Sequence, residues 1–153
     1  METAEQARIE AVRELGLLDT PPEERFDRVV RRARRLFDVP TVAVNLGDGD
    51  RLFVKSAVGL EPGISVPLED ALCPTALGRG EAMVIADARA DPDWSVNPSV
   101  TGDPHIRFYA ARPLAGPNGQ FVGALCLTDQ KPRELTGSDR ALLDDLAGPE
   151  GLA

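Results

Sequence analysis

The spacing of the apolar residues changes abruptly at Pro40, and this change constrains the fold more than any other feature of the chain. Before it, residues 22–37 carry apolar side chains three and four positions apart, which is the pattern of an amphipathic helix. After it, residues 41–46 and 51–58 form short apolar runs that are typical of strands. Because Gly-Asp-Gly-Asp separates the two runs, the sequence predicts a tight turn and a β-hairpin directly after the helix.

The same two periodicities predict the other regular elements. Further helices are expected at about 3–15 and 138–147, and the second of these is expected to begin at a capping Thr136 or Ser138. Thr20 is expected to cap the helix that starts near residue 22. Further strands are predicted at 83–86, 106–114 and 120–128, and a short helix at 70–78. The last two strands are apolar or small on both faces, which predicts a sheet that is covered on both sides.

Residues 87–105 form a long connection between two of these strands. It is rich in proline, although Asn97-Pro98 can begin one helical turn, and it holds the single Trp and the single His of the chain. A connection of this length in a compact domain is usually functional or disordered. Trp94 favours order, because a large ring needs a surface to pack on.

Composition excludes several classes of protein. No apolar run approaches the length of a membrane span, and the first residues are charged and lack the apolar core of a signal peptide. The two cysteines, Cys73 and Cys126, cannot make a disulfide scaffold, so a cytoplasmic protein is expected. A formal net charge of −8 argues against a nucleic-acid partner, and a single His leaves little material for a metal site.

A row of arginines on the outer face of the helix at 22–37 stands out in this acidic chain. It consists of Arg25, Arg28, Arg31, Arg32, Arg34 and Arg35. Such runs are most often solvated faces, and that is our interpretation here; a partner surface is the alternative.

Four stretches of the chain, taken in order, resemble bacterial GAF domains of the kind found with sensor histidine kinases and diguanylate cyclases. They are LGLLDTPPEERFDRVVRRARRLFDVPTVAVNLGDGDRLFVKSAVGL, MVIADARADPDW, NPSVTGDPHIRFYAARPL and GQFVGALCLTDQKPRELT. Together they cover about residues 10–147. The segment LDTPPEERFDR and the pair IRFYAARPL and VGALCLTD carry the resemblance most specifically.

The resemblance implies an α+β fold with a central antiparallel sheet of five or six strands. The terminal helices would cover one face, and the connections 60–80 and 87–105 would form a small-molecule pocket on the other. One domain over 1–147 and a flexible tail at 148–153 are expected. Two departures from the family pattern bear on function. No His follows Cys73 and no Cys-His dipeptide is available for bilin attachment, whereas Arg112 stands where relatives have a small residue and so needs a partner.

The implied function is that of a non-catalytic sensory domain that binds a small molecule and modulates a partner or output domain. The predicted ligand site consists of Cys73, Asp87, Trp94, His105, Arg107, Tyr109 and Cys126. Strand alternation places Arg107 and Tyr109 on one face, where Arg107 would bind an anionic or carbonyl-bearing ligand. The alternative is that Arg107 pairs with Asp87, Asp91 or Asp93 of its own loop. The ligand and any cofactor are not identified by the sequence.

Two further readings stay open beside the sensory one. The first is a cysteine-dependent reductase like free methionine-(R)-sulfoxide reductase, which has the same fold; we expect instead that both cysteines are structural and that no residue is catalytic. The second is a ligand-free scaffold that only dimerises. A homodimer is predicted through the stripes of the two terminal helices, with no membrane partner. These stripes are Ile9, Val12, Leu15, Leu142, Leu143 and Leu146.

Overall fold

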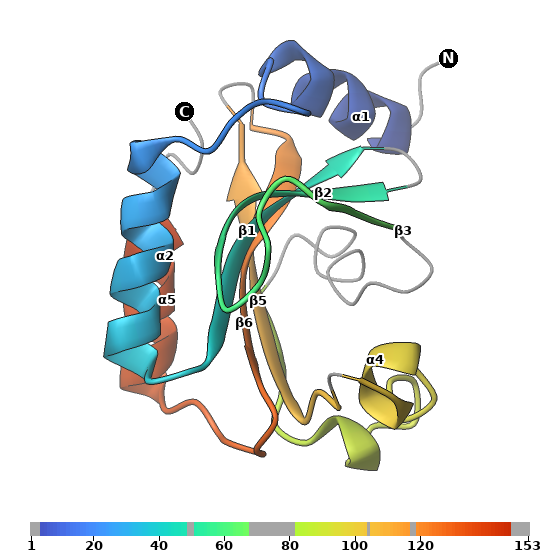
Figure 1. Cartoon of the computed structure of the whole chain (residues 1–153), viewed down its shortest axis with the longest axis vertical. Helices are drawn as coiled ribbons and strands as arrows, with labels where there is room; N and C mark the ends of the chain where they lie inside the picture. The colour runs from blue at the N-terminus through green and yellow to red at the C-terminus, as the bar shows by residue number, and fades with distance from the viewer. Residues whose placement is uncertain (1–3, 49–50, 68–81, 104, 117–118, 148–153) are drawn as a thin grey trace.

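Six strands of the described chain form one antiparallel sheet in the computed structural model (Figure 1). The structure describes residues 4–48, 51–67, 82–103, 105–116 and 119–147. The strands are β1 (Thr41–Asp48), β2 (Arg51–Val58), β3 (Ser65–Pro67), β4 (Met83–Ile85), β5 (Phe108–Ala115) and β6 (Phe121–Asp129). Their order across the sheet is β3-β2-β1-β6-β5-β4. The predicted antiparallel sheet and its two hairpins, β1–β2 and β5–β6, are confirmed.

Three helices cover one face of this sheet: α1 (Ala4–Glu14), α2 (Glu24–Phe37) and α5 (Gly137–Ala147) (Figure 1). α1 packs on β1 and β6, α2 on β1 and β2, and α5 on β5. The connection 87–105 lies on the other side and contains the short helices η2 (Ala88–Ala90) and α4 (Pro98–Thr101). The predicted placement of the terminal helices is therefore confirmed. The short helix expected at 70–78 and the tail at 148–153 lie outside the described residues.

Alternation along the central strands produces two separate cores. On β5, Phe108 and Ala110 face the helices, whereas Tyr109 and Ala111 face the opposite way. The core beneath the helices is the larger and contains the big apolar residues of α2. The second core is smaller and takes in Trp94 and Ile106 from the long connection. Both faces of the sheet are covered, as the apolar strands predicted.

The helix boundaries confirm two predicted caps and contradict a third. Asp139 N–H donates to Thr136 Oγ1 and Thr136 N–H donates to Asp139 Oδ2, which is a reciprocal cap at the start of α5. The Asn97 side chain likewise accepts from Ser99 N–H at the start of α4. Thr20, however, does not cap α2, because the helix begins at Glu24, after Glu23. Its hydroxyl instead donates to Leu17 O, 2.5 Å away.

The segment around Thr20 binds the buried side chain of Lys55. A bulge in the β1–β2 pairing leaves Lys55 as an extra residue, since Val44 pairs with Ser56 and Asn45 pairs with Val54. The Lys55 side chain is fully buried, and its ammonium group lies 2.5 Å from Thr20 Oγ1, 2.7 Å from Pro21 O and 2.7 Å from Glu23 Oε2. A buried charge requires such partners. Lys55 thus fastens the α1–α2 connection to the sheet.

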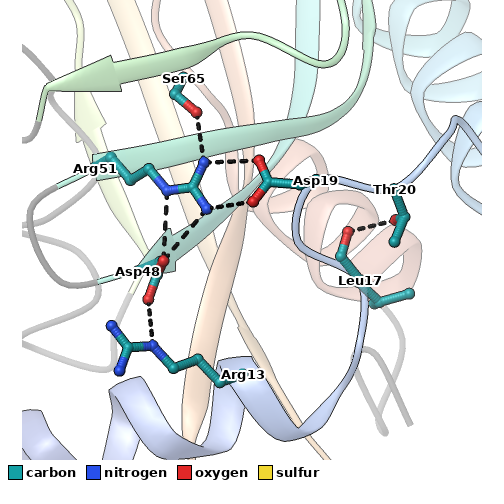
Figure 2. Close-up of polar contacts among 7 residues, drawn as sticks. All are labelled: Arg13, Leu17, Asp19, Thr20, Asp48, Arg51 and Ser65. Atoms are coloured by element: carbon teal, nitrogen blue, oxygen red, sulfur yellow. Dashed lines mark hydrogen bonds and ion pairs between the residues drawn. The ribbon is translucent and has the colours of Figure 1, made fainter.

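A second cation fastens the same connection at the end of the β1–β2 hairpin where Asp48 pairs with Arg51 (Figure 2). Arg51 donates to both carboxylate oxygens of Asp19 at 2.8 Å, and also to Ser65 Oγ at 2.9 Å. Asp48 lies 3.4 Å from Arg51 and 2.9 Å from Arg13 of α1. The hydrogen bonds from Arg51 lower the pKa of Asp19. α1, the connection and two strands are therefore held by one charged network.

The terminal helices are used differently from the predicted dimer seam. Val12 and Leu143 are 0% and 1% exposed inside the chain's own core. Leu15, Leu142 and Leu146 also pack against that core. α5 lies beside α2, and α1 crosses β1 and β6. Two of the six stripe residues are therefore buried within one chain and four are part-exposed, and the homodimer stays a prediction.

The close approach of β6 to β1 generates the first prediction. A Cβ added to Gly123 would overlap the carbonyl oxygen of Asn45, a backbone atom that cannot move without shifting β1. We expect Gly123→Ala to lower the free energy of unfolding by about 3 kcal/mol or more. In contrast, Gly137→Ala adds a Cβ with nothing within 4 Å and should be neutral or stabilising. Urea titrations compare the two; equal stability of both variants would contradict this packing.

A second prediction concerns Glu23 and pH. The hydrogen bond from Lys55 is the main cause that lowers the pKa of Glu23. A lowered carboxylate pKa stabilises the folded state at pH values above the pKa of Glu in the unfolded chain, which is about 4.3. That stability is lost as the pH falls further, through the pKa of the folded state. We expect Glu23→Gln to cost about 1 kcal/mol near pH 6, since the Glu23 side chain is part-exposed.

The difference between wild type and Glu23→Gln should shrink between about pH 4.5 and pH 3. Glu24→Gln, which removes an exposed partner of Arg31, is the control and should show little change over the same range. Urea titrations at several pH values measure both. A difference that stayed constant down to pH 3 would show that Lys55 does not bind the Glu23 carboxylate.

Candidate functional site

Three polar side chains meet in the apolar layer on the face of the sheet opposite α1, α2 and α5. They are Asn45 of β1, Tyr109 of β5 and Cys126 of β6. Asn45 Nδ2 donates to Cys126 Sγ at 3.5 Å, and Tyr109 Oη also lies 3.5 Å from that sulfur. The three residues are 9%, 3% and 4% exposed. Strand pairing places them together, because the central strands lie side by side in the order β1, β6, β5.

Small residues surround this cluster. Cys126 pairs with Ala43 on one side and with Ala111 on the other, and Asn45 pairs with Ala124. In a sheet, paired residues point to the same face, so these methyl groups lie next to the polar atoms. Polar atoms among small apolar groups are the usual lining of a small-molecule site. This face therefore has the composition that the predicted site requires.

Arg107, predicted to bind the ligand, has another role in the structure. Its guanidinium donates to the backbone carbonyls of Val100 and Ile106, at 2.9 and 3.2 Å. The predicted alternative, an ion pair with Asp87, Asp91 or Asp93, is also not what the described residues show. Arg107 holds the end of α4 to the start of β5. It fastens the long connection through backbone carbonyls, which a sequence does not reveal.

Asp87 also stabilises the connection itself. Its carboxylate accepts from Arg89 N–H at 3.1 Å, which caps η2, and pairs with the Arg89 guanidinium at 2.9 Å. The Arg89 hydrogen bond lowers the pKa of Asp87, with a smaller contribution from the charge of Arg107. The carboxylate is part-exposed and already has a cationic partner.

The remaining predicted residues lie around the cluster or outside the described chain. Trp94 is half-buried and packs against the second core. His105 is about half exposed, has a positive φ of 60°, and lies 3.5 Å from Asp103. It lies at the rim, just before β5. Cys73 lies outside the described residues. The structure thus brings Tyr109 and Cys126 together and places the other described candidates in the connection that covers them.

Asn45 is the member of the cluster that the sequence analysis missed. The available signal was one amide inside an otherwise apolar strand, TVAVNL. An amide at such a position needs hydrogen-bond partners, and Asn45 finds one across the sheet in Cys126.

Charge and exposure limit the chemistry of this face. Within the described part of the chain, no group of three or more His, Cys, Asp or Glu residues could hold a metal ion. The cluster offers an amide, a phenol and a thiol, which suit hydrogen-bonded recognition. A hollow of about 300 Å³ lies at the sheet end near this face, with Ile106, Thr128 and Gly59 in its lining. That volume is at the lower end for small-molecule sites.

None of the described helices has the length and apolar character needed to cross a membrane. Arg112, which the sequence analysis expected to need a partner, lies on the helix side of β5. It donates to Asp144 of α5 at 2.8 Å and so belongs to the helix packing and not to the candidate site.

Comparison with known proteins identifies the family and the fold. The GAF domain family model matches residues 21–148. A cyclic di-GMP phosphodiesterase of Pseudomonas aeruginosa is 37% identical over 145 residues, which are 94% of this chain and 24% of that protein. The chain therefore spans about a quarter of the length of this curated relative.

Two solved structures show the same fold at low sequence identity. The GAF domain of an Acinetobacter phosphoenolpyruvate-protein phosphotransferase superposes with a TM-score of 0.69 at 17% identity, covering 97% of this chain and 90% of that one. A type II free methionine-R-sulfoxide reductase from Thermoplasma acidophilum gives 0.67 at 16% identity, with 83% and 87% covered. The family match extends over most of the chain, and the chain belongs to the GAF domain family.

Proposed function

We propose that this GAF domain is a non-catalytic regulatory module that binds a small molecule on the face of its sheet opposite α1, α2 and α5. Binding would modulate an output domain or partner. The observation that carries the proposal is the buried cluster of Asn45, Tyr109 and Cys126. A sheet that served only as a scaffold would need no polar atoms in this layer, because burying them costs free energy. Recognition of a ligand gives those groups a use.

The covering connection supports the same proposal. Residues 87–105 are held by Arg107, Asp87 and Asn97 through contacts to backbone groups, and so they form an ordered cover over the second core. His105 at the rim has a backbone conformation that few non-glycine residues adopt. Such strain is often found at functional sites. A ligand beneath this cover would contact Tyr109 and Cys126 from above the sheet.

The signalling setting is part of the proposal. The similar phosphodiesterase is about four times as long as this chain, so the activity in its name is said of that protein and is not carried over to this domain. We propose that the domain works in the cytoplasm, as a homodimer, beside an output domain of this general kind. Since Val12 and Leu143 are buried in the core, the dimer would form through the part-exposed residues of the same stripes, Ile9, Leu15, Leu142 and Leu146.

A cysteine-dependent reductase is the second candidate, because one structural neighbour is a free methionine-R-sulfoxide reductase. At 16% identity this likeness concerns the fold alone. Cys126 is 4% exposed, whereas an attacking thiol has to be accessible to its substrate. We therefore favour the binding function.

The ligand prediction is tested by native mass spectrometry followed by calorimetry. The protein purified from its own host should retain a small molecule and should appear as a dimer. In calorimetry against cyclic mononucleotides, cyclic di-GMP and the retained molecule, Tyr109→Phe should weaken binding about tenfold, because it removes one buried hydrogen-bonding group. Ser56→Ala removes a hydroxyl from the helix side of the sheet and should leave the affinity unchanged. A ligand whose affinity is the same in Tyr109→Phe and Asn45→Ala would place the site elsewhere.

A separate prediction concerns the thiols. With free methionine sulfoxide and dithiothreitol, the protein should give no turnover above the buffer rate. In the folded protein, Cys126 should react slowly with a thiol reagent, and denaturation should make it reactive, because the fold covers it. Steady turnover that is lost in Cys126→Ser or Cys73→Ser would overturn the binding proposal in favour of the reductase.

A further inference from the structure

The outer face of α2 carries far more positive charge than the helix needs. Of its 14 residues, six are Arg and two are acidic. The buried residues Phe26, Val30, Ala33 and Phe37 face the sheet. Arg28, Arg32 and Arg35 follow one another at spacings of four and three on the opposite side, so they form one row that points to solvent. All three are exposed.

Two of the six arginines of α2 are paired with carboxylates, and the other four are not neutralised within the described chain. Arg25 pairs with Glu23, and Arg31 with Glu24. Arg28, Arg32, Arg34 and Arg35 make no ion pair with any residue that the structure describes. Like charges three and four positions apart on a helix repel each other. Arg34 and Arg35 gain from the negative end of the helix dipole, but Arg28 and Arg32 lie too far from that end to do so.

The row ends at a hollow of about 570 Å³, at the end of the sheet where α2 leads into β1. Arg34 and Arg35 line it from α2, and Lys131 and Arg133 line it from the segment after β6. Val39 and Pro40 supply apolar lining, and the neighbouring Leu36 is 48% exposed. Two segments from different ends of the chain thus converge on one cationic hollow.

Two carboxylates, Asp38 and Asp129, line this hollow and do not cancel the charge of the four cations Arg34, Arg35, Lys131 and Arg133. Asp129 is already held by the Arg133 guanidinium at 2.9 Å and by Lys131 N–H at 3.1 Å. Arg133 also donates to the carbonyls of Phe37 and Asp38, and so caps the end of α2. Arg34, Arg35 and Lys131 remain available to an incoming anion.

We propose that the outer row of α2 and this hollow form a docking surface for an acidic protein segment, one that carries several Asp or Glu side chains around an apolar residue. Guanidinium groups bind carboxylates through paired hydrogen bonds. The row from Arg28 to Arg35 extends for about 10 Å along the helix, which suits several carboxylates in one segment better than a single compact anion. Leu36 and Pro40, which are both exposed, provide a place for the apolar side chain.

Charge also decides between this partner and others. A second copy of the chain would bring arginine against arginine if the same face were used on both, and like charges across an interface oppose binding. A nucleic acid is a long anion and would extend well beyond the one basic helix. There it would be repelled by the rest of a protein whose net charge is −8. A short acidic segment contacts the row alone. This surface is separate from the candidate ligand site, and the inference does not depend on the proposed function.

The test measures fluorescence anisotropy of a labelled oligoglutamate peptide with a central leucine, titrated with the whole protein at low salt. The peptide should bind, its oligoglutamine counterpart should not, and added NaCl should weaken binding. Arg35→Glu and Lys131→Glu should each weaken binding by about fivefold or more, because each exchanges an attraction for a repulsion. Arg8→Glu on α1, at the other end of the molecule, changes the net charge equally and should leave the affinity within about twofold (Figure 1).

Thermal unfolding of all three variants checks that each is folded. If Arg35→Glu does not fold, Lys131→Glu still tests the docking surface. An equal loss in Arg8→Glu would reduce the effect to net charge and overturn the docking surface. So would failure of the peptide to bind. Tighter binding of a DNA duplex or of phosphatidylserine vesicles, with the same dependence on Arg35, would overturn the choice of an acidic protein segment.

Discussion

Both faces of the central strands are buried, and this constraint determines the place of every other element. On β6, Leu125 and Leu127 point to the helices, whereas Ala124 and Cys126 point to the opposite side. Three helices pack on the face with the large residues, and a thin cover of short helices and loop packs on the face with the small ones. Because the cover is thin and the residues beneath it are small, the polar group of Asn45 can lie in the middle of a sheet. The candidate site is a consequence of this unequal division of volume.

Local patterns predicted the parts of the fold that local physics decides. The apolar spacing from Phe26 to Phe37 was sufficient to predict α2, and the sequence offered Thr136 or Ser138 as the cap of α5, of which the structure uses Thr136. Strand alternation placed Arg107 and Tyr109 on one face, and the structure brings Tyr109 together with Cys126, which was another predicted ligand residue. The hydrogen bonds from Arg107 to Val100 and Ile106 were not foreseen, because backbone carbonyls are acceptors at every residue and leave no mark in the sequence. Asn45 was missed for a related reason: its partner is on another strand, 81 residues away.

The most distinctive segment of the sequence has a structural role. In LDTPPEE, Asp19 holds Arg51, while Thr20, Pro21 and Glu23 surround the Lys55 ammonium group. One buried cation thus engages several neighbouring residues of this segment at once. A strongly recognisable motif therefore need not mark the place where a domain binds its ligand. In this chain the motif and the candidate site lie on opposite faces of the same sheet.

The pairing of β1 with β6 has a consequence for how the domain is made in the cell. The first strand is translated long before its central neighbour, and the cap on α2 comes from Arg133, 96 residues after Phe37. At ordinary elongation rates the nascent hairpin waits roughly 4 to 16 seconds with one edge open. An open edge invites pairing with other chains. β1 can therefore pair with β6 only after the later part of the chain has been made, and slow codons ahead of β6 would lengthen the interval in which neighbouring polysomal chains can compete for that edge.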